Sequence, residues 1–178
     1  MRVFRFVIFL SIVCIGILYF QAKVIASEYV LPYPSFMPGN KVYTVMRIID
    51  SFEKWWYWGN IAGFKYHLKL ADKYLIEAKT LFEYKQYKLG MDALKRSDIQ
   101  IPMMVISLQS AYREGKDIKQ LQALAFDAMT AHVKVLERLL TELPSSFQWS
   151  PEKKQSVRLN LSDVLIESIA LRKKSLNN

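Results

Sequence analysis

Apolar residues recur three and four positions apart through most of the chain beyond residue 40. The clearest stripe places apolar side chains at alternating steps of four and three, at Phe64, Leu68, Ala71, Leu75, Ala78 and Phe82. In an α-helix this spacing brings all of them to one face, whereas no segment of useful length alternates with the period of a β-strand. The chain has only six glycines, which also disfavours turn-rich β architectures. The pattern predicts an all-α fold.

Helix-capping and helix-breaking residues divide this pattern into five predicted helices. The first covers residues 41–58, and Gly59 and Asn60 separate it from the second, which ends near the turn at 83–88. The third covers residues 87–115 and contains Pro102, where we expect a kink or a split. Asp117 caps the fourth, Pro144 ends it, and Ser150 with Pro151 starts the fifth. The predicted fold is an antiparallel bundle of four to five helices over residues 41–178.

The N-terminus has the pattern of an export signal. Two arginines precede an uncharged apolar run at residues 6–20, and small residues follow before Ser27. We predict a signal peptide at residues 1–26 that is cleaved before Ser27, or else an uncleaved anchor. The only cysteine, Cys14, lies inside this run, so the exported part has no thiol. Either alternative predicts an extracytoplasmic location: periplasmic, secreted or membrane-anchored and facing outside.

The charge of the chain narrows its partners only slightly. The formal net charge is +9, and it is +6 without Arg2, Arg5 and Lys23 of the export signal. Such an excess is compatible with an anionic lipid surface or an envelope polymer. We expect an unknown protein or envelope component as partner, possible contact with a membrane surface, and no nucleic acid.

Three prolines stiffen the segment at residues 27–40. The stretch YVLPYPSFMPGNKVY keeps an extended backbone until Asn40 caps the first helix. We expect this proline-rich arm to clasp the bundle, with Tyr33, Pro34 and Phe36 packed against helix aromatics.

The arm and the second predicted helix also resemble a family of exported bacterial and archaeal proteins of unknown function. The resemblance rests on the arm motif and on LKLADKYLIEAKTL at residues 68–81, and it covers about residues 29–100. Members start with a Y-x-L-P-Y-P-G-x-x-P pattern, from which Ser35 departs. The resemblance implies an exported helical domain. It brings no catalytic residue.

Few residues have the spacing of a chemical site. His67 and His132 are the only imidazoles, and with a methionine such as Met46, Met91 or Met129 they could bind haem or a metal. The alternative is that both are core or half-buried histidines with local hydrogen bonds. The acidic residues are predicted to lie on solvated helix faces, as Asp72 does beside Lys69 and Lys73. Asp98 differs, because it falls on the apolar stripe of the third helix, and it could cap a new helix after a break. No serine nucleophile or phosphate-binding loop is recognisable.

The most unusual local feature is KWWYWGN at residues 54–60. Successive helix residues point about 100° apart, so four consecutive aromatic side chains cannot all face one core. Trp55, Tyr57 and Trp58 are therefore a candidate contact surface for a membrane interface, a glycan or a protein. The alternative is that these rings cover the proline-rich arm at the end of the bundle.

These observations favour an exported, envelope-associated, non-enzymatic helical bundle that acts as a binding or structural module and uses no cofactor. The alternative is a periplasmic haem- or ligand-binding bundle that uses its two histidines. An envelope hydrolase would require a cluster of acidic residues in a cleft.

Overall fold

A computed structural model of the chain describes residues 29–34, 45–46, 48–49, 52, 57–152 and 155–176. This part is mostly helical. Four long helices are joined by short loops and one small antiparallel sheet, in the order α3 (Asn60–Glu83), α4 (Tyr87–Arg113), α5 (Lys119–Glu142), β1 (Ser146–Trp149), β2 (Val157–Asn160) and α6 (Leu161–Leu176). None of the described helices combines the length and hydropathy of a membrane span.

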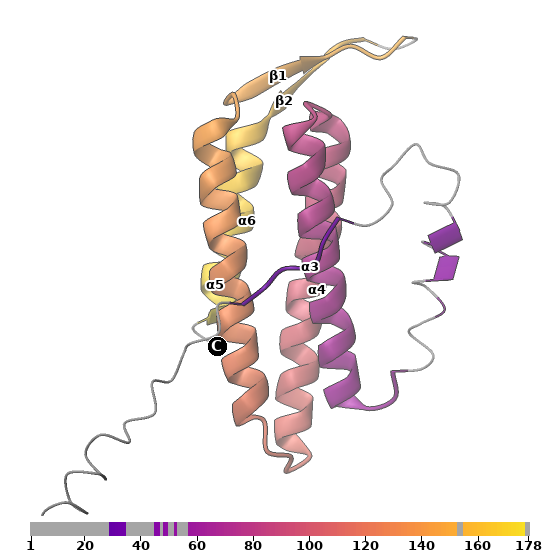
Figure 1. The fold of residues 1–178 in the computed structure, drawn as a ribbon, viewed down its shortest axis with the longest axis vertical. Coiled ribbons are helices and arrows are strands. Elements are labelled where there is room, and N and C mark those ends of the chain that lie inside the picture. The colour runs from indigo at the N-terminus through magenta and orange to yellow at the C-terminus, as the bar shows by residue number, and fades with distance from the viewer. Residues whose placement is uncertain are drawn as a thin grey trace, which may run out of the picture.

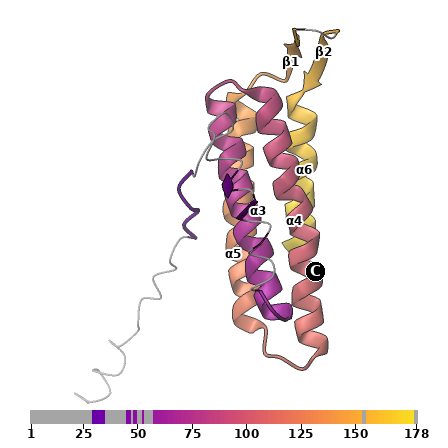
Figure 2. The same cartoon turned by 90° about the vertical axis from the view of Figure 1, so that its right-hand side faces the viewer.

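The four helices lie side by side, and successive helices run in opposite directions (Figures 1 and 2). The β-hairpin projects from one end of the bundle. α6 has 16 residues and α5 has 24, so at about 1.5 Å per residue α5 continues about 12 Å further. The lowest part of the bundle in Figure 1 is therefore built from α3, α4 and α5 alone.

The α3 stripe that the sequence predicts is buried. All six of its apolar residues are at most 5% exposed. They contribute to two large apolar clusters: one at the hairpin end, which includes Leu75, Leu94 and Leu136, and one at the opposite end, which includes Phe64 and Met129. Burial of this face accounts for the helix, because side-chain packing rather than intrinsic propensity supplies most helical stability.

The turn between α3 and α4 lies where the sequence predicts it. Lys85 adopts a left-handed conformation with φ +59°, and the N–H of Gln86 donates to the carbonyl of Leu81 at 2.8 Å. This is a Schellman-type ending, which satisfies carbonyls that the end of α3 leaves without helical partners. The same device ends α4, where Gly115 has φ +75° and the N–H of Lys116 donates to Ala111.

Of the kink or split that the sequence predicts at Pro102, the split does not occur. α4 continues through Pro102 without a split, and the proline ring is exposed. Asp98 therefore lies inside a helix and does not cap one. At the start of α5, Asp117 does accept a hydrogen bond from the N–H of Lys119, at 3.1 Å.

The predicted helix start at Ser150 and Pro151 was also wrong, and the fold is not all-α. Residues 146–149 pair with 157–160 in an antiparallel hairpin, and α6 begins ten residues later than expected. Leu159 turns into the core, and the ring of Phe147 lies 4.8 Å from that of Tyr87. The carbonyl of Ser145 accepts the N–H of Leu161, which fixes the start of α6. The hairpin depends on these contacts with distant residues, so its short strands give little signal in the sequence.

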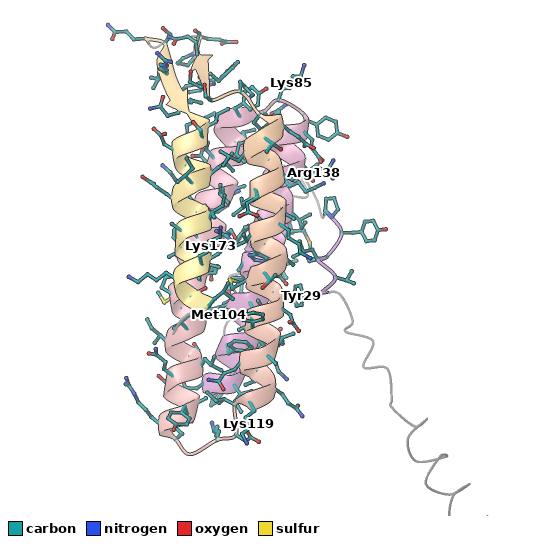
Figure 3. All side chains as sticks on the ribbon, turned by 90° about the vertical axis from the view of Figure 1, so that its left-hand side faces the viewer. Tyr29, Lys85, Met104, Lys119, Arg138 and Lys173 are labelled. Atoms are coloured by element: carbon teal, nitrogen blue, oxygen red, sulfur yellow. The ribbon has the colours of Figure 1, made fainter. Side chains whose placement is uncertain are left out.

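Residues 29–34 of the proline-rich arm form neither helix nor strand and cross from α5 to α3 on the outside of the bundle (Figure 1). Figure 3 shows Tyr29 beside α5. The arm packs through other residues than expected. Tyr29 and Leu31 contact the two apolar clusters, whereas Tyr33 is 96% exposed and Pro34 is exposed. The alternation follows from the extended backbone, which points successive side chains to opposite sides. Phe36 and the predicted signal segment at 1–26 lie outside the described residues.

The close packing of α3 on α4 predicts that Gly90→Ala destabilises the protein. A Cβ at position 90 would lie 2.7 Å from two ring carbons of Phe82, which is 1% exposed. We expect a loss of about 1–3 kcal/mol in the free energy of unfolding, measured by urea denaturation.

Gly63→Ala is the matched control, because its nearest neighbour is the partly buried Ser107 hydroxyl at 3.2 Å. Gly63→Ala should lower the free energy of unfolding clearly less than Gly90→Ala does. Adding Phe82→Leu to Gly90→Ala should make the combined loss smaller than the sum of the two single losses. Strict additivity would contradict the packing explanation.

Candidate functional site

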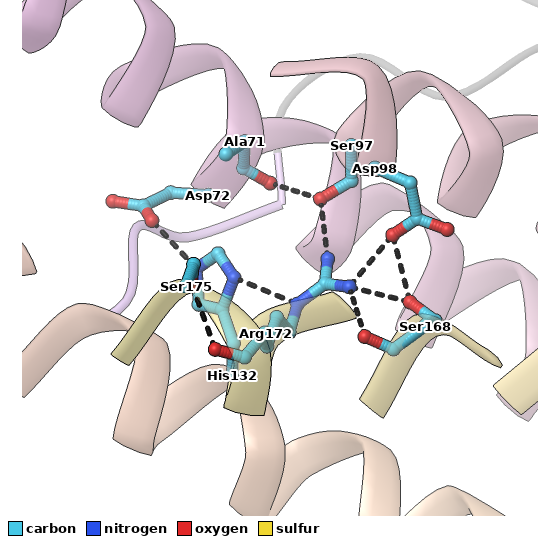
Figure 4. A network of polar contacts seen from close by, with 8 residues as sticks. All are labelled: Ala71, Asp72, Ser97, Asp98, His132, Ser168, Arg172 and Ser175. Carbon is cyan, nitrogen blue, oxygen red and sulfur yellow. Dashed lines mark hydrogen bonds and ion pairs between the residues drawn. The ribbon is translucent and has the colours of Figure 1, made fainter. Parts of the chain in front are cut away.

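A network of polar side chains, most of them buried, lies between the two apolar clusters (Figure 4). Each helix contributes at the same level of the bundle, through Asp72 of α3, Ser97 and Asp98 of α4, His132 of α5, and Ser168 and Arg172 of α6. Tyr29 of the arm completes it. The network joins segments as far apart in the sequence as residues 29 and 172.

Arg172 is the centre of this network and is 0% exposed. Its Nη1 donates to Asp98 Oδ1 at 2.6 Å, to the Ser168 carbonyl at 3.0 Å and to the Ser168 hydroxyl. Its Nη2 donates to Ser97 Oγ at 2.9 Å, and its Nε donates to His132 Nδ1 at 3.2 Å. A guanidinium has five N–H donors in a fixed plane, so a single side chain can join α4, α5 and α6.

The hydrogen bonds determine the tautomer of His132. Because Arg172 can only donate, Nδ1 must accept, and the neutral ring carries its proton on Nε2. Nε2 lies 2.7 Å from Asp72 Oδ1 and donates to it. The second oxygen of Asp72 accepts the hydroxyl of Tyr29 at 2.5 Å. A continuous chain of hydrogen bonds therefore links Arg172, His132 and Asp72, and Tyr29 of the arm donates to Asp72 from the outer end.

The pKa values of these groups shift in directions that favour this protonation state. Burial lowers the pKa of His132 below its usual value of 6.5, and the nearby Arg172 cation lowers it further, while Asp72 opposes both. Burial also lowers the pKa of Arg172, with Asp98 acting in the opposite direction. Burial and the Asp72 carboxylate raise the pKa of Tyr29. Neutral His132 and neutral Tyr29 are therefore the stable forms.

The network is suited to holding helices in place. Asp72 is 6% exposed and His132 is 0% exposed, and both ring nitrogens of His132 have protein partners. The sequence suggested a solvated Asp72 beside lysines, and this was wrong: the side chain faces His132 and Tyr29. A buried guanidinium is costly unless its donors are satisfied, so the four helices are constrained to one mutual arrangement.

Two of these partners had a signal in the sequence. Asp98 and His132 both lie on apolar stripes, and a polar residue in such a position indicates a buried partner. The prediction that His132 is a core histidine agrees with its burial, but its hydrogen-bond partners are not local: they lie 40 and 60 residues away in the sequence. Arg172 and Tyr29 gave no such signal, because a basic residue near a helix C-terminus and an arm tyrosine are ordinary features.

His67 lies apart from the network. Its Nδ1 is 2.9 Å from Gln100 Oε1, and its ring contacts Tyr66 edge-on. The structure thus gives the two histidines separate sets of partners. Met91 and Met129, two of the suggested axial ligands, belong to different apolar clusters. Among the described residues, no group of three or more histidine, cysteine or acidic side chains could hold a metal.

The aromatic cluster before α3 is described only in part. Trp58 is 85% exposed, and the ring of Tyr57 lies 5.1 Å from that of Tyr66. Trp55 lies outside the described residues. Trp58 thus remains a candidate contact residue, whereas Tyr57 packs on α3.

An open cleft of about 610 Å³ lies where α6 ends, between the C-terminal half of α4 and the N-terminal half of α5. Its floor is formed by buried or half-buried apolar side chains of Met104, Val105, Leu108, Ile118, Ala125 and Leu176. Exposed residues form its rim, among them Gln109, Tyr112, Arg113 and Phe126. Figure 3 shows Met104 near the end of α6. The size and lining are those of a site for an apolar small molecule.

Comparisons with known proteins found no match to the chain among family models, curated proteins or solved structures.

The network predicts that Arg172→Met is strongly destabilising. Removing the cation takes the ion-pair partner from the half-buried Asp98 and leaves Nδ1 of the buried His132 without a donor, which together should cost about 3 kcal/mol. Urea denaturation should show this loss. Arg138→Met removes an exposed i,i+4 pair with Glu142 and should leave the midpoint unchanged. Equal effects of the two substitutions would rule out a special role for the buried guanidinium.

Stability should also fall on acidification because of His132. Its pKa is lower in the folded chain than in the unfolded chain, so the unfolded state binds more protons as the pH falls below 6.5. This contribution is fully present above pH 6.5 and is lost as the pH falls toward the folded-state pKa. Urea midpoints measured between about pH 5 and pH 8 should decrease toward the acid end.

In a His132→Gln variant, the part of the pH dependence of the urea midpoint that comes from His132 should vanish. His67→Gln should retain it, because His67 does not belong to the network. A parallel pH dependence in the wild type and His132→Gln would contradict the assignment.

Proposed function

We propose that the chain is an exported, non-enzymatic binding module, and that it takes an apolar ligand in the cleft between α4, α5 and the end of α6. The observation that carries this proposal is the cleft itself. Its volume of about 610 Å³ falls within the range of about 300–1,000 Å³ that is usual for small-molecule sites. Exposed apolar surface of this kind is uncommon in a protein that has no partner for it.

The buried network supports the same proposal by positioning the cleft. Arg172 ties α6 to α4 and α5, and Ser175 and Leu176 at the end of the same helix line the cleft. Leu176 follows Arg172 by four residues, so it lies one turn further along nearly the same face. A preformed, rigid cleft binds with a smaller entropic cost than one that must be assembled.

The distribution of reactive groups favours binding over catalysis. Arg172, His132 and Asp98 are occupied in holding helices, and they lie at the boundary of the clusters rather than in the cleft lining. The haem- or metal-binding alternative would require His132 to give up Asp72 or Arg172. That exchange would leave a buried charged partner without its hydrogen bond, which is unfavourable.

Location in the cell envelope is a proposal that rests on the sequence. The basic and apolar pattern of residues 1–26 supports export, and the resemblance of residues 29–100 points to the same class of protein. A fifth helix before α3 is part of this proposal, since Val45, Ile48 and Phe52 are helical. These three side chains and Trp58 are exposed, which would suit contact with a membrane surface or an envelope partner.

A variant that fills the cleft tests the binding site. The uncharged fluorophore N-phenylnaphthylamine should bind the wild type saturably, with increased fluorescence. Ala125→Trp places a large ring in the lining and should weaken binding by at least about tenfold, which is the loss of one well-buried apolar contact.

Ala170→Trp is the matched control, because Ala170 is exposed on α6 and does not line the cleft. It should bind the fluorophore as the wild type does, and circular dichroism should show that both variants are folded. Unchanged binding by Ala125→Trp would place the site elsewhere. No saturable binding by the wild type would remove the proposal.

A further inference from the structure

The cleft has one charged side chain in its lining, and it is a cation. Arg113 belongs to the last turn of α4 and lies on the exposed rim. Within the described part of the chain, no ion pair or hydrogen bond occupies its guanidinium. A guanidinium matches the planar geometry of a carboxylate through two parallel hydrogen bonds. Arg113 is therefore available to an anionic group of a ligand.

The neighbouring acidic residues do not cancel this charge at the cleft. Glu114 pairs with Lys116, which lowers the pKa of the Glu114 carboxyl, and it also accepts a hydrogen bond from Asn60. Asp117 accepts the N–H of Lys119 at the start of α5. Neither carboxylate lines the cleft, whereas Gln109 and Gln122 add neutral hydrogen-bonding groups to the rim.

The apolar lining residues of α4 follow the helix away from Arg113. Met104 and Arg113 are nine residues apart on α4, which corresponds to about 14 Å along the helix axis. Met104 is 1% exposed and Leu108 is half-buried, so the lining becomes more buried with distance from Arg113. A cation at one end and an apolar strip along the helix match a molecule with a head and a single flexible tail.

We propose that this cleft binds a free single-chain amphiphile with an anionic headgroup, the chemistry of a fatty acid. The headgroup would lie at Arg113, and the acyl chain would extend over Leu108 toward Met104. The inference rests on the proposed function and assigns the ligand class of the same site. A concave cleft of limited volume fits one chain better than the flat surface of a bilayer or a second copy of the protein.

Calorimetric titration of the full chain with soluble ligands tests the inference. Octanoate, decanoate and dodecanoate are used below their aggregation concentrations. Affinity should rise about fourfold for each added methylene until the cleft is filled. Dodecanoate should bind at least about tenfold more tightly than dodecanol or dodecyltrimethylammonium, because only the carboxylate can pair with Arg113.

Two charge-reversal variants separate a specific contact from general attraction. Arg113→Glu should weaken dodecanoate binding by about tenfold or more while leaving dodecanol binding unchanged. Arg158→Glu makes the same change in net charge on β2, at the opposite end of the bundle, and should bind dodecanoate as the wild type does. In spectra of isotope-labelled methionine methyl groups, dodecanoate should shift Met104 and leave Met91 of the hairpin-end cluster in place.

Each other outcome identifies a different error. Equal binding of all three dodecyl compounds, unaffected by Arg113→Glu, would overturn the anionic headgroup and leave the apolar site standing. Absence of binding by any dodecyl compound or by N-phenylnaphthylamine would remove the proposed function as well. Binding to anionic phospholipid vesicles but not to dodecanoate would replace the amphiphile with a bilayer. Concentration-dependent dimerisation that Ala125→Trp abolishes would replace it with a second copy.

Discussion

The rest of the structure depends on one buried cation, Arg172. A guanidinium without water is stable only when its donors all find acceptors, and here the acceptors come from α4, α5 and α6. His132 in turn donates to Asp72 of α3, and Asp72 accepts the hydroxyl of Tyr29 in the arm, so both segments are held by the same network. Apolar packing alone tolerates sliding and rotation of helices, whereas hydrogen bonds of fixed length and direction do not. The network therefore sets the relative heights of the four helices.

The fixed position of α6 explains why a cleft lies between α4 and α5 beyond the end of this shorter helix. α6 is anchored at Arg172, four residues before its last described residue, so the end of the helix is held in place. α4 and α5 extend further and leave apolar side chains facing the space that a longer α6 would fill. The cleft is thus a consequence of unequal helix lengths combined with a fixed register. A loosely packed α6 could tilt to close the gap.

Much of the helical architecture could be predicted from spacing alone. The stripe of α3, the turn after Glu83 and the end of α5 before Pro144 all lie where short-range rules place them, because helix periodicity and caps are properties of a few neighbouring residues. The predictions that were wrong concern features that short-range rules do not determine. Pro102 does not split α4, Ser150 does not start a helix, and Tyr33 is not the residue that fastens the arm. The hairpin and the attachment of the arm depend on contacts between residues distant in the sequence, such as Phe147 with Tyr87 and Tyr29 with Asp72.

The sequence by itself determined a helical chain with an extended arm, since both follow from the local conformational limits of the backbone. It also marked His132 and Asp98 as polar residues on apolar stripes. Only the tertiary structure decided that these two side chains and Asp72 share Arg172 as a common centre, directly or through a neighbour. It also decided that the end of α6 opens a cleft with Arg113 on its rim. Periodicity identifies the face of a helix that is buried, but it contains no information on the height at which another helix meets that face. Partner choice among buried polar groups is therefore a property of the assembled core.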